Sequence, residues 1–255
     1  MLAQDEGIAR QTSTVNVVVG ECNDAYLNDA RGRHVREEHV LAALRGASAG
    51  PVAQGAVGAG VGMVAFGYKG GVGTASRRVP REMGGWTVGA LVVSNMGRRR
   101  QLTIDGVPVG CLLAEEEAER PESGSIMVVL ATDAPLTARQ LGRLCRRVPH
   151  GLARTGSISG SGSGDFAIAF STAQRIPRAS DAGELQLRSL PDESPAFDLT
   201  LQAVVEAVEE AVIASLFRAE TVTGYAGRTV PALPLPPVLA LLQHYGRLRE
   251  VPPEL

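Results

Sequence analysis

The chain is poor in several residue types, and each scarcity narrows what the protein can be. Aromatic residues make up only 4% of the 255 residues, so the core must be built from Val, Leu, Ile and Ala. Three cysteines, Cys22, Cys111 and Cys145, stand far apart without a CxxC pair. They form neither a disulfide framework nor a zinc signature, and they fit a reducing compartment.

Charge and hydropathy exclude two further classes of partner. Lys and Arg number 25 against 27 Asp and Glu, so no basic excess favours nucleic acid. No apolar run approaches the roughly 20 residues of a membrane-spanning helix. Residues 1–10 also lack the basic and apolar regions of a signal peptide. We therefore expect a cytoplasmic protein without nucleic-acid or membrane partners.

Histidine is scarce too, with four residues in the chain. His34 and His39 are five apart, and no His/Glu pair stands at the spacing of helical metal ligands, so we expect no bound metal. No GxSxG motif is present to position a Ser-His-Asp triad. A nucleophilic serine here would need another base. A freed α-amine, whose ordinary pKa is about 7.7–8.0, is the natural candidate.

Strand and helix patterns alternate without a clear change in composition, which predicts one domain over residues 1–255. Apolar and β-branched runs predict strands at 14–20, 88–94, 101–104, 126–131 and 165–170. Helical spacing predicts helices at 35–44, from Thr137 onward, at 199–218 and at 238–245. Gln140 stands in capping-box spacing to Thr137, and Pro149 should end or kink that helix.

Glycine-rich segments at 58–62, 70–73 and 160–164 superficially resemble phosphate-binding loops. None of them has the GxxxxGK[ST] lysine of a P-loop or a clean strand-to-helix context. A nucleotide- or phosphate-binding module therefore remains a weak alternative, and we expect no cofactor.

Gly124-Ser125 combines a small residue with a hydroxyl nucleophile. An acidic polar run at 115–123 precedes it, and the apolar run 126–131 follows. This layout is the one expected if the chain cuts itself before Ser125 and leaves a new N-terminal serine. Locally, an ordinary loop residue entering a strand fits as well.

Several other blocks occur in a fixed order with this one, between about residues 16 and 225. They are Asp24-Ala-Tyr-Leu-Asn-Asp29, His34-Val-Arg-Glu-Glu-His-Val-Leu-Ala-Ala43, Lys69-Gly-Gly-Val-Gly-Thr-Ala-Ser-Arg77, Ile104-Asp-Gly-Val-Pro-Val-Gly110, Ala153-Arg-Thr-Gly156 and Gly162-Ser-Gly-Asp165. Together they resemble the DmpA-type self-processing aminopeptidases (peptidase family S58). That family includes L-aminopeptidase/D-esterases and β-peptidyl aminopeptidases.

The resemblance implies an α+β fold of the αββα sandwich type. It also implies a cut between Gly124 and Ser125 into fragments 1–124 and 125–255. Ser125 Oγ would then attack the carbonyl of a substrate's N-terminal residue, with its own α-amine as base. Because family members carry a substantial segment ahead of the matching region, we expect the fragment 1–124 to be N-terminally incomplete.

The resemblance also assigns roles to four further residues. Ser163 and Asp165 match the serine and acidic residue beside the nucleophile, although many relatives have glutamate at the second position. Asn95 matches the asparagine that stabilises the oxyanion, and Tyr26 matches a tyrosine that lines the site.

We therefore expect an autoprocessed aminopeptidase or amidase acting on small peptides, amides or esters. The resemblance implies assembly into a homo-oligomer of cut units, and no cofactor. The alternative is an unprocessed, truncated and inactive member that serves as a binding or assembly partner.

Overall fold

The central element of the computed structural model is a four-stranded sheet. The structure describes residues 6–8, 10, 16–113, 124–176 and 183–248. The strands are β3 (Gly71–Arg78), β4 (Thr87–Asn95), β5 (Gly124–Thr132) and β6 (Ser163–Ser171), in that order across the sheet. The pairs β3–β4 and β4–β5 are antiparallel, whereas β5 and β6 are parallel. The parallel pair begins at the same edge of the sheet, so the first residues of β5 and β6 lie side by side.

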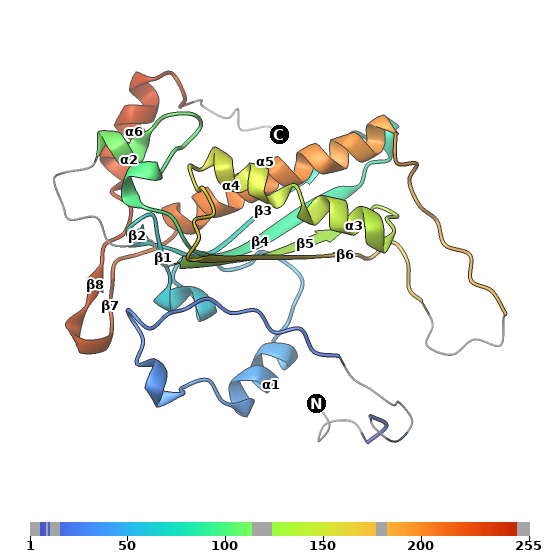
Figure 1. Cartoon of the computed structure of the whole chain (residues 1–255), viewed down its shortest axis with the longest axis horizontal. Coiled ribbons are helices and arrows are strands. Elements are labelled where there is room, and N and C mark those ends of the chain that lie inside the picture. Colours follow the sequence, from blue (N-terminus) through green and yellow to red (C-terminus); the bar gives the residue numbers. More distant parts are fainter. Residues whose placement is uncertain (1–5, 9, 11–15, 114–123, 177–182, 249–255) are drawn as a thin grey trace.

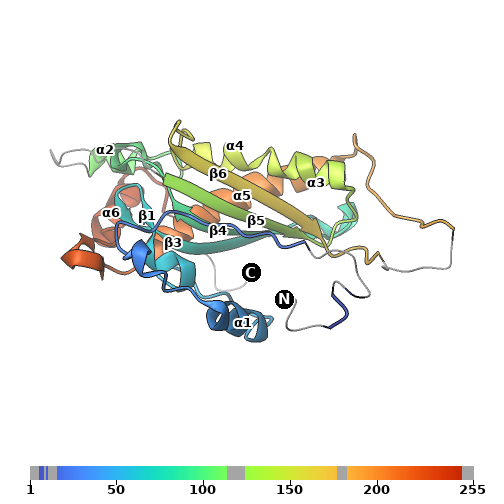
Figure 2. The ribbon, with the colours of Figure 1, turned by 60° about the horizontal axis from the view of Figure 1, so that its bottom comes forward.

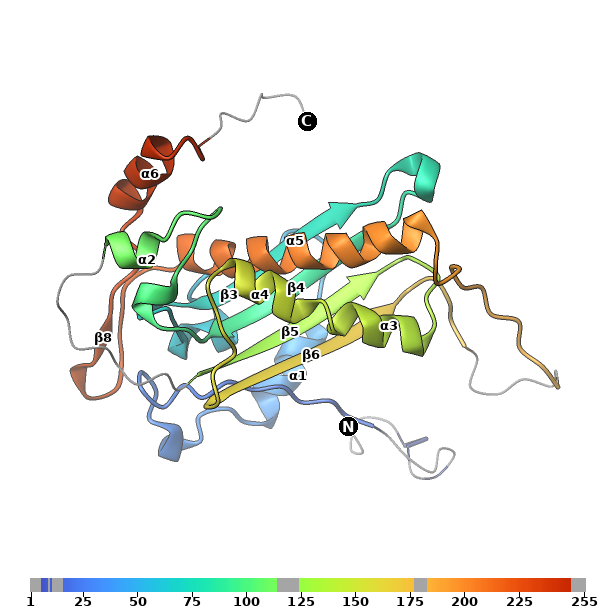
Figure 3. The ribbon, with the colours of Figure 1, turned by 45° about the horizontal axis from the view of Figure 1, so that its top comes forward.

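Helices cover one face of this sheet (Figures 1 and 3). α5 (Pro195–Phe217) lies across β3 and β4, while α3 (Ala138–Cys145) lies on β6 and α4 (Val148–Arg154) packs beside α5. The inward side chains of β4 and β5 alternate with outward ones, as the twofold period of a strand requires. Aliphatic side chains between sheet and helices form the core, as the scarcity of aromatic residues requires.

Small residues in β3 allow this strand to pack directly against α5. A Cβ atom on Gly73 would lie 1.9 Å from the carbonyl oxygen of Ala211 on α5. Only glycine therefore lets the helix backbone approach the strand this closely. Sequence patterns missed this strand, because its glycines and small polar residues are untypical of a strand.

The opposite face of the sheet is apolar and partly open. Phe166 and Phe170 of β6 are 65% and 46% exposed there. The extended segment 16–24 crosses this face (Figure 2), where the Cys22 thiol lies 3.6 Å from the carbonyl oxygen of Val93. The described residues contain two small two-stranded sheets but no second sheet as large as the first.

The expected α+β class is confirmed. Of the four layers of the expected αββα sandwich, the described residues form one large sheet and the layer of helices that covers it. No helix among these residues combines the length and the apolar character needed to cross a membrane.

The remaining elements are short and surround the sheet. They are η1 (Ala30–Gly32), α1 (Glu37–Arg45), η2 (Gly58–Gly62), β1 (Val64–Ala65), β2 (Tyr68–Lys69), η3 (Arg81–Met83), η4 (Arg99–Gln101), α2 (Val109–Leu112), β7 (Val222–Thr223), η5 (Tyr225–Gly227), β8 (Thr229–Val230) and α6 (Leu235–His244).

Two local predictions are wrong. Residues 16–20 form no strand, and residues 14–15 lie outside the described part. The predicted strand at 101–104 is replaced by η4 and by a single bridge from Ile104 to Val107, because the turn at Asp105 closes at once. The prediction that Pro149 ends or kinks the helix is confirmed: α3 ends at Cys145, four residues before the proline, and Pro149 stands in the first turn of α4, where its missing N–H costs nothing.

Candidate active site

The predicted site residues gather where β4 ends and where β5 and β6 begin. Ser125 on β5 pairs in register with Asn95 on β4 and with Gly164 on β6. Ser163 and Asp165 flank Gly164, so they stand directly beside Gly124 and Ile126. A Cβ atom on Gly164 would lie 3.8 Å from the Cβ of Ser125, so these positions share the open face of the sheet.

Two buried polar atoms at these strand starts have no hydrogen-bond partner among the described residues. They are Ser125 Oγ and Asp165 Oδ2. The other carboxylate oxygen of Asp165 accepts a hydrogen bond of 2.6 Å from Ser163 Oγ. Buried polar atoms without partners are rare in native structures and often mark functional positions. The described residues thus place a buried hydroxyl oxygen and a buried carboxylate oxygen without hydrogen-bond partners at the starts of adjacent strands.

The Asn95 amide has an orientation dictated by its backbone neighbours. Its Oδ1 accepts from the N–H of Val64 at 2.8 Å, and its Nδ2 donates to the carbonyl oxygen of Asn23 at 3.0 Å. A backbone N–H can only donate and a carbonyl oxygen can only accept, so the amide cannot be reversed. The contacts of the described residues use one of the two Nδ2 protons. The second has no acceptor among these residues, and Asn95 is the register partner of Ser125.

Tyr26 lies next to the residues that hold Asn95. It belongs to the turn that starts at Asn23, the residue whose carbonyl accepts from Asn95. Its ring stands 5.3 Å from the guanidinium carbon of Arg228, which also donates to the Tyr26 carbonyl oxygen. These contacts position the turn, and its role in lining the substrate pocket stays a prediction.

Gly124 is required for steric reasons. A Cβ atom at this position would lie 2.3 Å from the carbonyl oxygen of Asn95 and 2.8 Å from the Cα of Met96. Any larger residue would push the start of β5 away from the end of β4. The acidic run at 115–123 lies outside the described residues.

Cys22 is a neighbour of Ser125 that sequence reasoning missed. Burial raises the pKa of its thiol, and the interaction with the adjacent Ser125 side chain partly offsets this rise. Its position on a separate extended segment leaves no pattern around Gly124-Ser125 that could have revealed it.

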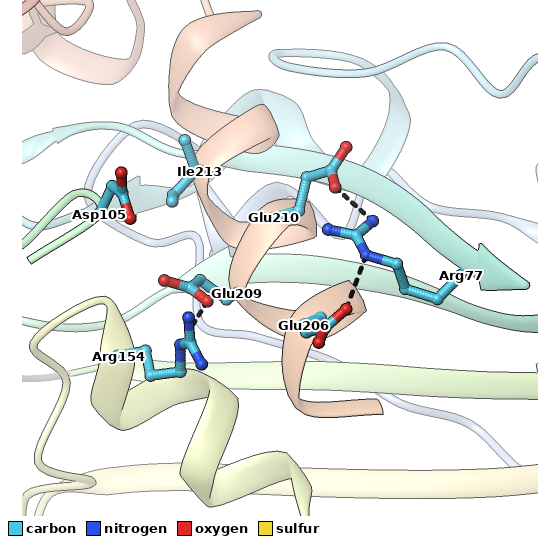
Figure 4. A pocket seen from close by; sticks show the side chains of 7 residues that line it. All are labelled: Arg77, Asp105, Arg154, Glu206, Glu209, Glu210 and Ile213. Atoms are coloured by element: carbon cyan, nitrogen blue, oxygen red, sulfur yellow. Dashed lines mark hydrogen bonds and ion pairs between the residues drawn. The ribbon is translucent and has the colours of Figure 1, made fainter. Parts of the chain in front are cut away.

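A second cluster of charged side chains lies on the helix side of the sheet (Figure 4). Its cavity of about 340 Å³ is formed between β3, α4 and α5. Arg77 bonds to Glu206 at 3.1 Å and to Glu210 at 2.6 Å, and Arg154 bonds to Glu209 at 2.5 Å. Arg77 pairs with Val88, at the opposite end of β4 from Asn95. Both arginines are already paired. We therefore interpret the cluster as a set of structural ion pairs that join α5 to β3 and to α4.

The glycine-rich segment 58–62 has a structural role. In η2, a Cβ on Gly60 would lie 2.7 Å from the Val72 nitrogen, and one on Gly62 would lie 2.5 Å from the Asp24 Cβ. The Gly60 carbonyl, not its amide, faces the nearest cation, Lys69. A phosphate site needs amide donors instead. Among the described residues, no group of three His, Cys, Asp or Glu side chains could hold a metal ion.

The chain is similar to known proteins in both sequence and structure. The chain is 41% identical over 246 residues to the β-peptidyl aminopeptidase BapA of Sphingosinicella microcystinivorans, covering 91% of this chain and 62% of that protein. It is 40% identical over 232 residues to BapA of Sphingosinicella xenopeptidilytica, covering 85% and 57%. The chain therefore spans about three fifths of the length of these curated relatives.

Solved structures agree in fold. The PH0078 protein from Pyrococcus horikoshii OT3 superposes with a TM-score of 0.89 at 48% identity, covering 97% of this chain and 67% of that one. The L-aminopeptidase D-Ala-esterase/amidase from Ochrobactrum anthropi, described as a prototype for the serine aminopeptidases and a variant of the Ntn hydrolase fold, gives a TM-score of 0.80 at 42% identity. That match covers 89% of this chain and 62% of the other. The profile of peptidase family S58 matches residues 1–230, and the chain belongs to this family.

Proposed function

We propose that the chain is a self-processing N-terminal-nucleophile hydrolase that removes N-terminal residues from small peptides, amides or esters. The observation that carries the proposal is the pair of buried, unpartnered atoms, Ser125 Oγ and Asp165 Oδ2, at the starts of adjacent strands. The family relationship supports it, since the named relatives are aminopeptidases.

Self-processing would begin with attack of Ser125 Oγ on the carbonyl carbon of Gly124. The peptide bond breaks, an ester forms and the Ser125 nitrogen takes up the proton of the hydroxyl. Water then hydrolyses the ester, leaving a carboxylate on Gly124 and a free α-amine on Ser125. The glycine suits this step, because it lets the scissile peptide approach the backbone of Asn95 closely.

Substrate hydrolysis would use the same hydroxyl. The freed α-amine takes the proton from Ser125 Oγ, which attacks the carbonyl of the substrate's first residue. The unused proton on Asn95 Nδ2 stabilises the negative charge that develops on the carbonyl oxygen. The resulting ammonium then protonates the leaving group, and a water molecule, deprotonated by the amine, hydrolyses the ester and releases the acyl group from Ser125.

Ser163 and Asp165 would act mainly on the new amine. Gly124 is paired with Ser163, so a cut at Gly124 creates the amine beside Ser163. Strand alternation puts Asp165 on the helix side with Ile126, opposite the Ser125 hydroxyl. A carboxylate there favours the ammonium form and would give Asp165 Oδ2 its missing partner.

Assembly and location complete the proposal. The open apolar face that carries Phe166 and Phe170 supports association of cut units into a homo-oligomer. The three free cysteines support a reducing compartment such as the cytoplasm.

Hydrolysis of aminoacyl-p-nitroanilides, with α- and β-aminoacyl groups in both stereochemical forms, tests the proposal. We expect the chain to release p-nitroaniline from at least one of them and Ser125→Ala to release none. The matched control Ser76→Ala changes a serine of β3 far along the sheet and should keep full activity. If the chain is inactive on every substrate, or if Ser125→Ala keeps its activity, the proposal is wrong. The unprocessed binding partner then becomes the better account.

A further inference from the structure

Lys69 is the only lysine among the 25 basic Lys and Arg residues of the chain, and it is completely buried. The three hydrogen atoms of its ammonium group are all used. Nζ donates to the carbonyl oxygens of Gly60, Met63 and Gly70, each at 2.7 Å. A compact ammonium with three rotatable donors suits such a set of carbonyls, whereas the planar fork of arginine does not.

This buried charge has no ion-pair partner among the described residues. Burial lowers its pKa to about 8, so the ammonium form still predominates at pH 7. A buried cation held only by neutral carbonyls is costly for stability. A functional reason for keeping it should therefore lie close by.

The Met63–Val64 peptide connects Lys69 to the candidate active site. Its carbonyl oxygen accepts from Lys69 Nζ at 2.7 Å, and its N–H donates to Asn95 Oδ1 at 2.8 Å. Val64 and Lys69 are paired in β1 and β2, but neither backbone N–H serves that ladder. The Lys69 N–H donates to the carbonyl oxygen of Pro231, and the Val64 N–H donates to Asn95 Oδ1.

Hydrogen bonds in such a chain strengthen one another. When an ammonium group donates to the carbonyl oxygen of a peptide, it polarises that peptide. The N–H of the same peptide then becomes a stronger donor, by roughly 10–30% per bond. The Asn95 amide receives this donor on Oδ1, which in turn makes its Nδ2 protons stronger donors. One of these bonds to Asn23, and the other remains for the oxyanion over Ser125.

We propose that Lys69 is a positioning residue for the oxyanion site: its ammonium holds and polarises the Met63–Val64 peptide, which fixes the Asn95 amide. This inference rests on the proposed function and assigns a role to a residue outside the nucleophile, base and oxyanion donor. Lys69 itself does not touch the substrate.

Lys69→Met tests the role, since methionine fills the space without charge or donors. We expect kcat for an aminoacyl-p-nitroanilide to fall at least tenfold while KM stays within about twofold, because the donor acts in the transition state. Arg77→Met, which removes a cation from the structural cluster of Figure 4, should leave both constants unchanged.

A double-mutant cycle separates a role through Asn95 from a merely structural one. Asn95→Ala alone should cost about 10²–10³-fold in kcat, the usual loss of an oxyanion donor. If Lys69 acts through Asn95, adding Lys69→Met to this variant should cost less than twofold more. Fully additive losses would overturn the inference. An Asn95→Ala variant with normal kcat would instead overturn the proposed role of Asn95.

Val64→Pro carries the test if Lys69→Met does not fold. Proline removes the N–H that holds Asn95, while the Lys69 ammonium keeps its three carbonyl acceptors. The preceding residue, Met63, has φ −82° and ψ 143°, a conformation that proline accepts in its neighbour. We expect the same loss in kcat at constant KM. A folded Val64→Pro variant with normal kcat would contradict the relay.

Discussion

At the scale of single residues, the site is defined by polar atoms that the uncut chain leaves without partners. Ser125 Oγ and Asp165 Oδ2 are buried, whereas Ser163 and Asn95 are held in place by hydrogen bonds. The two fixed residues are neighbours of the free atoms on adjacent strands. This division is what the proposed function requires of a preorganised site.

Asp165→Asn should separate charge from shape at the new amine. We expect kcat/KM for an aminoacyl-p-nitroanilide to fall about 10²-fold or more, since the amide no longer favours the ammonium form. Asp165→Glu keeps the carboxylate and should stay within about tenfold of the native chain. The control Asp198→Asn, in the first turn of α5, should have no effect. Native kinetics for Asp165→Asn would rule out a role of the charge.

The buried ammonium of Lys69 should also appear in the pH dependence of stability. Its pKa falls from the ordinary 10.5 to about 8 on burial, so between these values the unfolded chain holds the proton more tightly. Its contribution to the free energy of unfolding therefore rises with pH across this interval, by at most about 1.4 kcal/mol per pH unit.

Urea unfolding of the native chain and Lys69→Met from pH 7.5 to 10 would measure this effect. The native chain should gain stability relative to the variant as the pH rises. A difference that is independent of pH would show that Lys69 keeps an ordinary pKa in the folded chain.

At the scale of elements, sequence patterns predict helices and strands that show a regular local spacing of apolar residues. They miss a strand whose residues are chosen by its close packing against a helix distant in the sequence. The capping box of Thr137 and Gln140 and the long helical stripe of α5 are confirmed. β3 was missed, because its glycines serve a helix that lies more than a hundred residues away in the chain. For the site, the residues follow from family resemblance. Their register and the role of the Met63–Val64 peptide required the structure.

Gly73→Ala tests the contact between β3 and α5. The added Cβ would meet the Ala211 carbonyl oxygen at 1.9 Å, so we expect a loss of about 1–3 kcal/mol in the free energy of unfolding. Gly142→Ala is the matched control, since no atom lies within 4 Å of a Cβ there and α3 should gain about 0.5–1 kcal/mol. Urea denaturation measures both, and equal effects would contradict the packing argument.

At the scale of the whole molecule, the two faces of the sheet differ. Helices bury one face, while the segment 16–24 crosses the other (Figure 2), where the Cys22 thiol contacts the Val93 carbonyl oxygen. The starts of β5 and β6 place the candidate nucleophile on this second face. Under the proposed function, self-processing, substrate access and association of subunits would therefore all take place on this side of the molecule.

Phe170→Gln tests whether this face promotes association. The side chain is 46% exposed at the end of β6 away from Ser163, so a polar replacement should weaken self-association without loss of stability. Leu187→Gln, at 56% exposure in a surface loop, is the control and should change nothing. Sedimentation velocity over a range of concentrations would show the difference, and identical profiles would exclude Phe170 from the interface.

The central claim is that the bond between Gly124 and Ser125 is cut by the chain itself. Intact-mass analysis with N-terminal sequencing of the purified chain tests it directly. The account predicts a fragment that begins Ser-Ile-Met-Val and a complementary fragment that ends at Gly124, with Ser125→Ala remaining a single chain. A native chain that stays whole at its full 26.7 kDa would contradict the claim.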